Sequence, residues 1–148
     1  MPYLTNPLTH GWAVIDVLVG VSRLRRQVLQ RNSFPVPHPV PVRALIDTGA
    51  SISGFSPRVF RELGISPVGT TPVLTPSTRP DAPHECDLYD VTLSIVAEGS
   101  AHLFPDARVM EADCWLPGEG IEALIGTDIL NHCFFQFIGR DRTFTLAF

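Results

Sequence analysis

The sequence predicts a mainly β fold, closed into a barrel or stacked as a sandwich, with one or two short helices. Most apolar runs are short, rich in valine and isoleucine, and too brief for a typical helix, and residues 88–96 alternate at period two. The chain has 148 residues, 45% of them hydrophobic, and a mean hydropathy of +0.17. A chain of this length and composition buries a real core and is not disordered. We therefore expect residues 1–148 to form one domain.

The expected strands follow one another along the chain. Residues 12–21 (WAVIDVLVGV) are β-branched and too short to favour a helix. Residues 42–47 (VRALID) form an apolar run that ends at an acid and meets Thr-Gly, which indicates a buried strand feeding a turn. Three further strands are expected at residues 88–96, 107–112 and 121–126. The tail, residues 133–148, predicts a hairpin of two aromatic strands around the polar turn at 139–142.

Helix signals are few. Ser56 followed by Pro57, with Gly64 about two helical turns later, predicts a short capped helix between them. A second short helix is expected to begin near Thr127 and run through DILNHC, with Thr127 or Asp128 as its cap.

The sequence also contains two proline-rich segments and one basic cluster. Residues 35–41 carry proline at every second position, which favours extended backbone. Residues 72–83 contain four prolines and predict an exposed, irregular excursion. The basic cluster contains no aromatic residue for base stacking, so a solvated edge or loop is the preferred interpretation; it comprises Arg23, Arg25, Arg26 and Arg31.

Charge and cysteine content narrow the possible partners. Fifteen acidic residues against eleven basic ones, all arginine, give a net charge of −4, which does not favour nucleic-acid binding. The apolar stretch 12–21 is interrupted by Asp16 and is far shorter than a membrane span, so no membrane association is expected. The three cysteines, Cys86, Cys114 and Cys133, are odd in number and irregularly spaced, which favours a reducing, cytoplasmic setting.

The segment LIDTGAS contains the strongest candidates for functional residues in the sequence. Asp47 stands at the end of a very apolar strand, where an unpaired carboxylate costs several kcal/mol and therefore has a partner or a task. Thr48 supplies a hydroxyl, Gly49 allows a backbone amide to approach the carboxylate, and Ser51 offers a second donor to it. Taken alone, Asp-Thr-Gly is more often an ordinary turn than an active site.

A second sequence element makes the Asp-Thr-Gly motif more specific. About seventy residues downstream, ALIGTDIL repeats the pattern of an apolar strand followed by glycine and a short helix. ALIDTGAS with ALIGTDIL at this spacing resembles the retropepsin-like aspartic peptidases, and the resemblance covers most of the chain in order. It implies a retropepsin-like acid-protease β-barrel.

The resemblance also implies site residues. Asp47 matches the catalytic aspartate, and Thr48, Gly49, Ala50 and Ser51 match the loop that supports it. Gly126 and Asp128 match the second hydrophobic-Gly element, in which the acid has a structural role. Family members cleave extended peptides with a water molecule held between two aspartates and need no cofactor or metal. The groups His84-Glu85-Cys86 and His132-Cys133 lack the spacing of a metal site.

The sequence contains a single Asp-Thr-Gly, so a pair of aspartates requires two chains. We expect a twofold homodimer with Asp47 of each subunit at the axis, and the tail strand as an interface strand or as a plain edge or core strand. Two alternatives remain: a catalytically silent dimerisation or peptide-binding module with this fold, and a monomeric β domain with a coincidental turn. Residues 70–85, the expected flap, carry four prolines and no glycine, unlike many family flaps.

Overall fold

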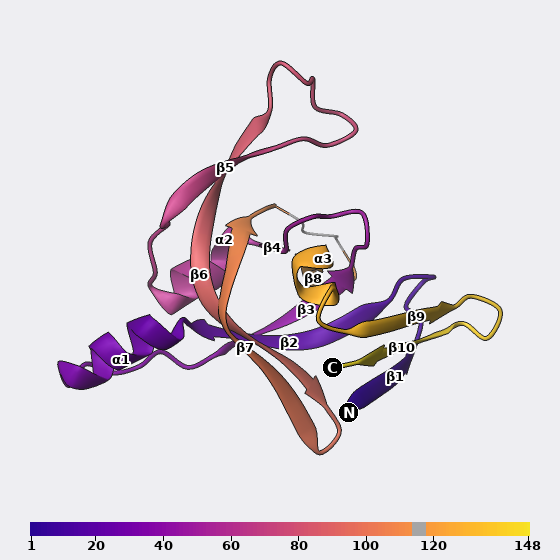
Figure 1. Ribbon diagram of the computed structural model, residues 1–148, viewed down its shortest axis with the longest axis horizontal. Helices are drawn as coiled ribbons and strands as arrows, with labels where there is room; N and C mark the ends of the chain where they lie inside the picture. The colour runs from indigo at the N-terminus through magenta and orange to yellow at the C-terminus, as the bar shows by residue number, and fades with distance from the viewer. Residues whose placement is uncertain (114–117) are drawn as a thin grey trace.

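The computed structural model describes residues 1–113 and 118–148, and its centre is a closed six-stranded barrel (Figure 1). The barrel strands are β2 (Val14–Val21), β3 (Val40–Ile46), β4 (Gly54–Phe55), β6 (His84–Ala97), β7 (Ser100–Glu111) and β8 (Ile121–Ile125). Their order is β2-β3-β8-β4-β7-β6, and pairing of β2 with β6 closes the ring. Closure removes the exposed strand edges that an open sheet would present.

The barrel interior is filled by β-branched and aliphatic side chains. Alternation along the strands puts every second residue inside, as in β3, where buried and exposed residues alternate from Val40 to Ala44. Each aliphatic side chain buried in this way contributes about 1.5–3 kcal/mol of transfer free energy. Well-buried aliphatic residues of the barrel strands include Ile15, Val17, Val19, Val21, Val91, Leu93, Ile95, Val109, Ile121 and Ile125.

Helix α2 (Pro57–Leu63) covers the barrel and confirms the helix predicted between Ser56 and Gly64. Phe60 is buried and stacks on Tyr89, with ring centroids 3.8 Å apart. The helix ends at Gly64, whose φ of 61° is a left-handed conformation that glycine adopts without strain. Ser56 occupies the N-cap position, but its hydroxyl donates to the Glu122 carboxylate instead of capping the helix.

Two structures extend from the barrel. Strand β5 (Gly69–Val73) pairs with the beginning of β6, and this hairpin rises above the barrel with the loop 74–83 at its tip (Figure 1). On the right of the same view, a three-stranded sheet is formed in the order β1-β10-β9. Its strands are β1 (Tyr3–Pro7), β9 (Phe134–Ile138) and β10 (Thr143–Ala147). The predicted tail hairpin is thus confirmed, and the last strand lies at the centre of this sheet, paired on both sides.

The basic cluster is a helix, so its interpretation as an edge or loop was wrong. Helix α1 (Arg23–Arg31) begins at Ser22, whose hydroxyl accepts a hydrogen bond from the Arg25 amide at 3.3 Å. Arginine, leucine and glutamine favour helix, and the segment contains no glycine or proline. None of its residues is buried, and it projects from the left end of the molecule in Figure 1. The described part of the chain therefore has three helices rather than one or two.

Several boundaries also differ from the prediction. Strands β6 and β7 are longer than residues 88–96 and 107–112, because β6 continues into the hairpin with β5 and into a long ladder with β7. Strand β2 begins at Val14, and Trp12 instead forms an isolated bridge with Thr9. Helix α3 covers only Thr127–Leu130. Among the described helices, none has the length and apolarity that crossing a membrane requires.

Candidate active site

Asp47 lies in the turn that follows β3. Its amide donates to the Ile125 carbonyl at 2.9 Å, which fastens the turn to the parallel strand β8. The carboxylate accepts a hydrogen bond from the Gly49 amide, with 2.9 Å between Oδ1 and the nitrogen. A side chain at position 49 would place its Cβ 3.2 Å from this oxygen, so glycine leaves room for the amide to approach the carboxylate. Asp47 itself is half-buried.

The neighbours of Asp47 in the motif lie at the surface. Thr48 and Ser51 are exposed, and Ala50 is half-buried. Within the described residues, the Gly49 amide is the one group that donates to the Asp47 carboxylate. Ser51 therefore does not supply the second hydrogen bond that the sequence suggested.

The second hydrophobic-Gly element is joined to this turn by a buried polar network. The Asp128 carboxylate accepts two hydrogen bonds from Ser53, at 2.9 Å from its amide and 2.8 Å from its hydroxyl. The Ser53 hydroxyl in turn accepts a hydrogen bond from the Gly126 amide at 3.0 Å. Ser53 is fully buried, so these bonds satisfy polar atoms that have no access to water. The sequence reasoning missed Ser53, although a serine followed directly by apolar strand residues was a signal to look for its partner.

The loop and the element also touch through their backbones. The Ala50 carbonyl accepts hydrogen bonds from the Thr127 amide at 2.8 Å and from the Thr127 hydroxyl at 3.2 Å. A Cβ at Gly126 would lie 2.8 Å from the same carbonyl oxygen, so only glycine fits at this crossing. Helix α3 is capped by Gly126, and the prediction of Thr127 or Asp128 as its cap was wrong because both side chains bond to the loop.

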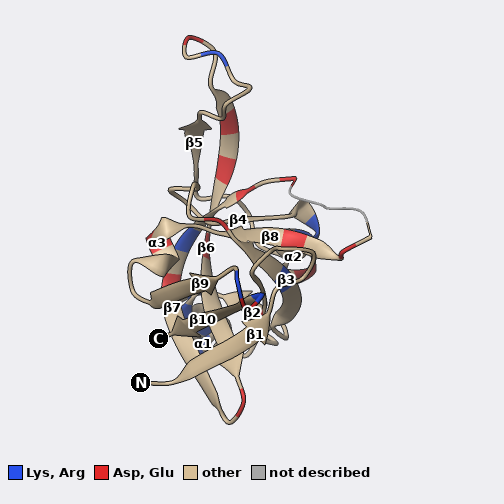
Figure 2. Cartoon of the chain, turned by 90° about the vertical axis from the view of Figure 1, so that its right-hand side faces the viewer, with Lys and Arg blue, Asp and Glu red and all other residues tan. Residues whose placement is uncertain are grey.

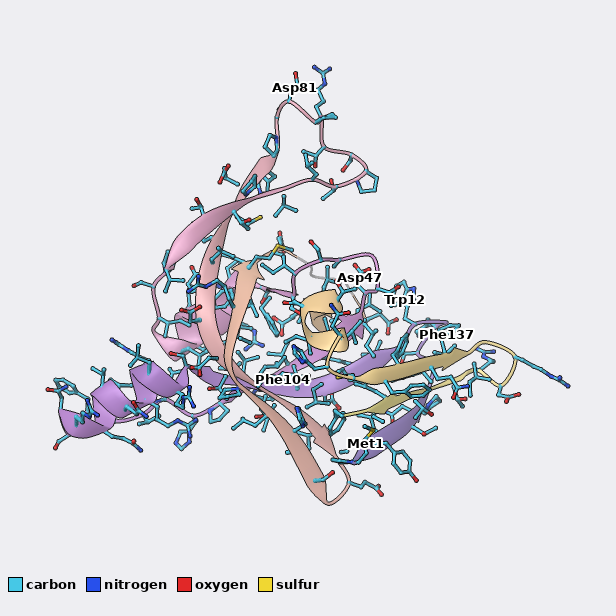
Figure 3. All side chains as sticks on the ribbon, viewed as in Figure 1. Met1, Trp12, Asp47, Asp81, Phe104 and Phe137 are labelled. Carbon is cyan, nitrogen blue, oxygen red and sulfur yellow. The ribbon has the colours of Figure 1, made fainter. Side chains whose placement is uncertain are left out.

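A cleft of about 750 Å³ opens over Asp47. Its floor is the DTG loop, and its roof is the end of β5 with the first residues of the loop 74–83. Apart from Asp47, most of the lining is apolar: Ala50, Ile52, Pro72, Val73, Leu74, Pro76, Met110 and Leu124. In Figure 3, Asp47 lies below the loop that carries Asp81 at its tip. The cleft has the size and apolar lining of a ligand site.

Two ion-pair groups join elements of the fold, and one of them reaches the cleft. Arg58 binds Glu122 with two hydrogen bonds and Glu62 with one, and these bonds raise the pKa of Arg58 and lower that of Glu122. Across the β6–β7 ladder, Arg108 binds both oxygens of Asp90, at 2.8 and 2.9 Å, and lowers the pKa of that carboxyl. The Arg108 side chain also lines the cleft.

The remaining candidate groups do not assemble into a site. In residues 1–113 and 118–148, no three histidine, cysteine or acidic side chains converge as metal ligands. Cys86 and Cys133 are free thiols, and burial raises the pKa of each. Cys114 lies outside the described residues.

Comparison with known proteins gives a match in structure and none in sequence. No protein-family model matches the chain. No curated protein matches it either. A retropepsin-like aspartic protease from Rickettsia conorii superposes with a TM-score of 0.62, covering 99% of this chain and 91% of the other, at 16% sequence identity. EIAV protease in complex with the inhibitor HBY-793 matches with a TM-score of 0.46 and 19% identity, over 82% of this chain and 86% of that one.

The chain therefore has the retropepsin-like fold over nearly its whole length. The expectation of a mainly β, barrel-forming retropepsin-like chain is confirmed by this match and by the barrel itself. At 16% identity the match establishes the fold, and what the chain does has to be argued from its own residues.

Proposed function

We propose that the chain is an aspartic endopeptidase, one domain that supplies half of an active site and hydrolyses peptide bonds as a homodimer. The observation that carries the proposal is the Asp47 carboxylate, bonded by the Gly49 amide in the floor of a largely apolar 750 Å³ cleft. The retropepsin-like fold makes this turn the expected place for a catalytic aspartate. An extended polypeptide fits between this floor and the β5 roof as an added strand.

In the proposed reaction, Asp47 of each subunit faces a water molecule across the twofold axis. Two carboxylates that face the same water molecule share one proton, because it is costly to ionise both of them so close together. The ionised carboxylate takes a proton from the water as its oxygen attacks the peptide carbonyl carbon, and the protonated one donates to the carbonyl oxygen. The tetrahedral intermediate then collapses: the carboxyl group that took the water proton gives it to the nitrogen as the C–N bond breaks, and the other carboxylate takes a hydroxyl proton back from the intermediate. An acid and an amine leave, and the pair again shares one proton. No metal or cofactor takes part.

The three-stranded sheet β1-β10-β9, called the terminal sheet, has features that support the proposal of a dimer. Its fifteen strand residues include no charged side chain, and Figure 2 shows these strands in front without a red or blue segment. Tyr3 and Phe134 both pair with Ala147, so they lie on one face of this sheet, where they are 65% and 57% exposed. Exposed apolar groups that lie close together mark an interaction surface. Because β10 is paired on both sides, a second subunit would meet the face of this sheet or its β1 and β9 edges.

The test combines a variant with a mixing experiment. Cleavage of unfolded α-casein should fall by roughly 10⁴-fold or more in Asp47→Asn, a loss typical of removing one member of a catalytic unit. Asp141→Asn, a matched change at an exposed acid in the β9–β10 turn, should retain activity.

Mixing then tests the shared site. When wild-type and Asp47→Asn subunits are mixed in equal amounts, about half of the wild-type subunits pair with an inactive partner, so activity per wild-type subunit should halve. Sedimentation should show a dimer for both chains. Full cleavage by Asp47→Asn would refute the catalytic role, and unchanged activity on mixing would refute the shared site. A stable dimer that cleaves nothing would favour the silent binding module.

A further inference from the structure

The cleft is the first of three hollows that adjoin along strand β7. A second hollow of about 410 Å³ lies between β7 and α3, and it shares Arg108 and Asp128 with the cleft. A third of about 310 Å³ shares Asp106 and Arg108 with the second and reaches Leu24 of helix α1. The three hollows thus adjoin one after another along β7, from the cleft to α1, and the second and third together are called the track.

A bulge in β7 directs the end of this track toward the helix. Thr92 of β6 faces two residues of β7, Pro105 and Asp106, where the register shifts. Such an extra residue re-aims the side chains beside it. The Asp106 carboxylate here lies 2.8 Å from the Arg23 guanidinium, which ties the beginning of α1 to the track.

Asp106 and Arg108 of the track form ion pairs, whereas three of the four arginines on α1 form none in the part of the chain that the structure describes. Asp106 binds Arg23, and Arg108 binds Asp90. Arg25, Arg26 and Arg31 are exposed, and within the described residues none of them forms an ion pair. The surrounding sequence has no compensating acid, because residues 17–46 contain five arginines and none of the fifteen acidic residues. In a chain of net charge −4, α1 is therefore an isolated positive surface.

We propose that α1 and this track form a docking site for an acidic segment of the polypeptide substrate, outside the residues held in the cleft. The proposal rests on the proposed function. Because the track adjoins the cleft, one extended chain would pass from the cleft along it, and the free arginines would select negative charge at the far end of that chain. In a homodimer each subunit has one track, so an acidic segment on either side of the cleaved bond would have a track to bind.

The dimensions set where the acidic residues should lie. From Met110 in the cleft to Asp106 is about 13 Å along the strand, and Arg25 to Arg31 spans about 9 Å of helix. An extended peptide advances about 3.3 Å per residue. Acidic residues beginning roughly five residues from the segment in the cleft would therefore lie over α1.

The test compares peptides that differ only in their tails. Mass spectrometry of digested α-casein identifies a cleaved sequence, which is then synthesised with a neutral spacer of about five residues and a tail of four glutamates or four glutamines, on either side. At low salt the glutamate tail should raise kcat/KM by about ten-fold over the glutamine tail, an effect that high salt should screen. The triple variant Arg25→Gln, Arg26→Gln, Arg31→Gln should abolish this preference and still cleave the glutamine-tailed peptide normally.

A matched control removes the same charge elsewhere. Arg61, Arg140 and Arg142 are also exposed and have no ion-pair partner among the described residues, so their triple replacement by glutamine should keep the preference. Equal cleavage of both peptides by the wild type would overturn the proposal, as would a preference that survives the α1 variant or disappears in the control.

A binding measurement separates this proposal from the proposed function. Fluorescence anisotropy of labelled peptides with the Asp47→Asn chain reads docking without cleavage. Stronger binding of the glutamate tail, lost in the α1 variant, would support docking even if no peptide were ever cleaved. Arginine-dependent sedimentation with phosphatidylserine vesicles, without any preference between the peptide tails, would overturn the proposal in favour of a membrane surface.

Discussion

Replacing Asp128 by alanine should destabilise the chain by about 3 kcal/mol. The carboxylate accepts two hydrogen bonds from Ser53, and hydrogen bonds to charged groups contribute roughly 1.5–3 kcal/mol each. Their loss leaves the amide and hydroxyl of the fully buried Ser53 without their hydrogen-bond acceptor. Because Asp128 itself is half-buried, water entering the space restores part of the loss, which places the estimate at the lower end of the sum.

Urea unfolding at a fixed protein concentration measures this change, since a dimer's stability depends on concentration. The melting temperature should fall by about 6–12 °C, at roughly 2–4 °C per kcal/mol for a domain of this size. Asp128→Asn keeps one carbonyl acceptor and should lose about half as much. Asp141→Ala, an exposed acid in the β9–β10 turn, should change stability by less than about 0.5 kcal/mol. A loss below about 1 kcal/mol in Asp128→Ala would refute the structural role of this network.

Three further predictions follow from the same contacts. Gly126→Ala should cost about 1–3 kcal/mol in urea unfolding, because its Cβ would lie 2.8 Å from the Ala50 carbonyl oxygen; a neutral effect would show that the loop yields. Hydrogen bonds from Arg58 lower the pKa of Glu122 in the folded chain, so its contribution is complete above the ordinary glutamate pKa of about 4.3 and is lost as pH falls below it. The difference in unfolding free energy between wild type and Glu122→Gln should therefore shrink from about pH 7 toward pH 3, and a constant difference would contradict this. Burial, together with the hydrogen bond to Glu111, raises the pKa of Tyr89 to about 12, so ultraviolet titration should show a late step that Tyr89→Phe removes.

Most strands of the barrel could be predicted because each has a signal in its own local sequence. Alternating β-branched residues give the strands of residues 88–96 and 121–126, and the proline and glycine around residues 57–63 give α2. Strand β4 is different: its two residues, Gly54 and Phe55, are a strand only because β7 and β8 lie on either side of them. Pairing between distant segments leaves no periodic signal in so short a stretch.

Helix α1 shows a different failure. Its arginines were interpreted by their charge, and charge alone says nothing about backbone conformation. The local signals were present: Ser22 as a cap, followed by nine residues without glycine or proline. Without a buried face, however, the segment lacks the apolar stripe by which a helix is usually recognised.

The two acids that the sequence singled out differ in how much of each carboxylate the fold uses. Both follow an apolar strand, Asp47 after β3 and Asp128 shortly after β8. Both oxygens of Asp128 accept hydrogen bonds from Ser53, so both hold the loop to the second element. Within the described residues Asp47 receives one hydrogen bond, at Oδ1, from a backbone amide that cannot neutralise its charge. A half-buried carboxylate that lines a cleft, with one oxygen that accepts no hydrogen bond from the described residues, is suited to bind a water molecule. This contrast supports the proposal of a catalytic role for Asp47 and a structural role for Asp128.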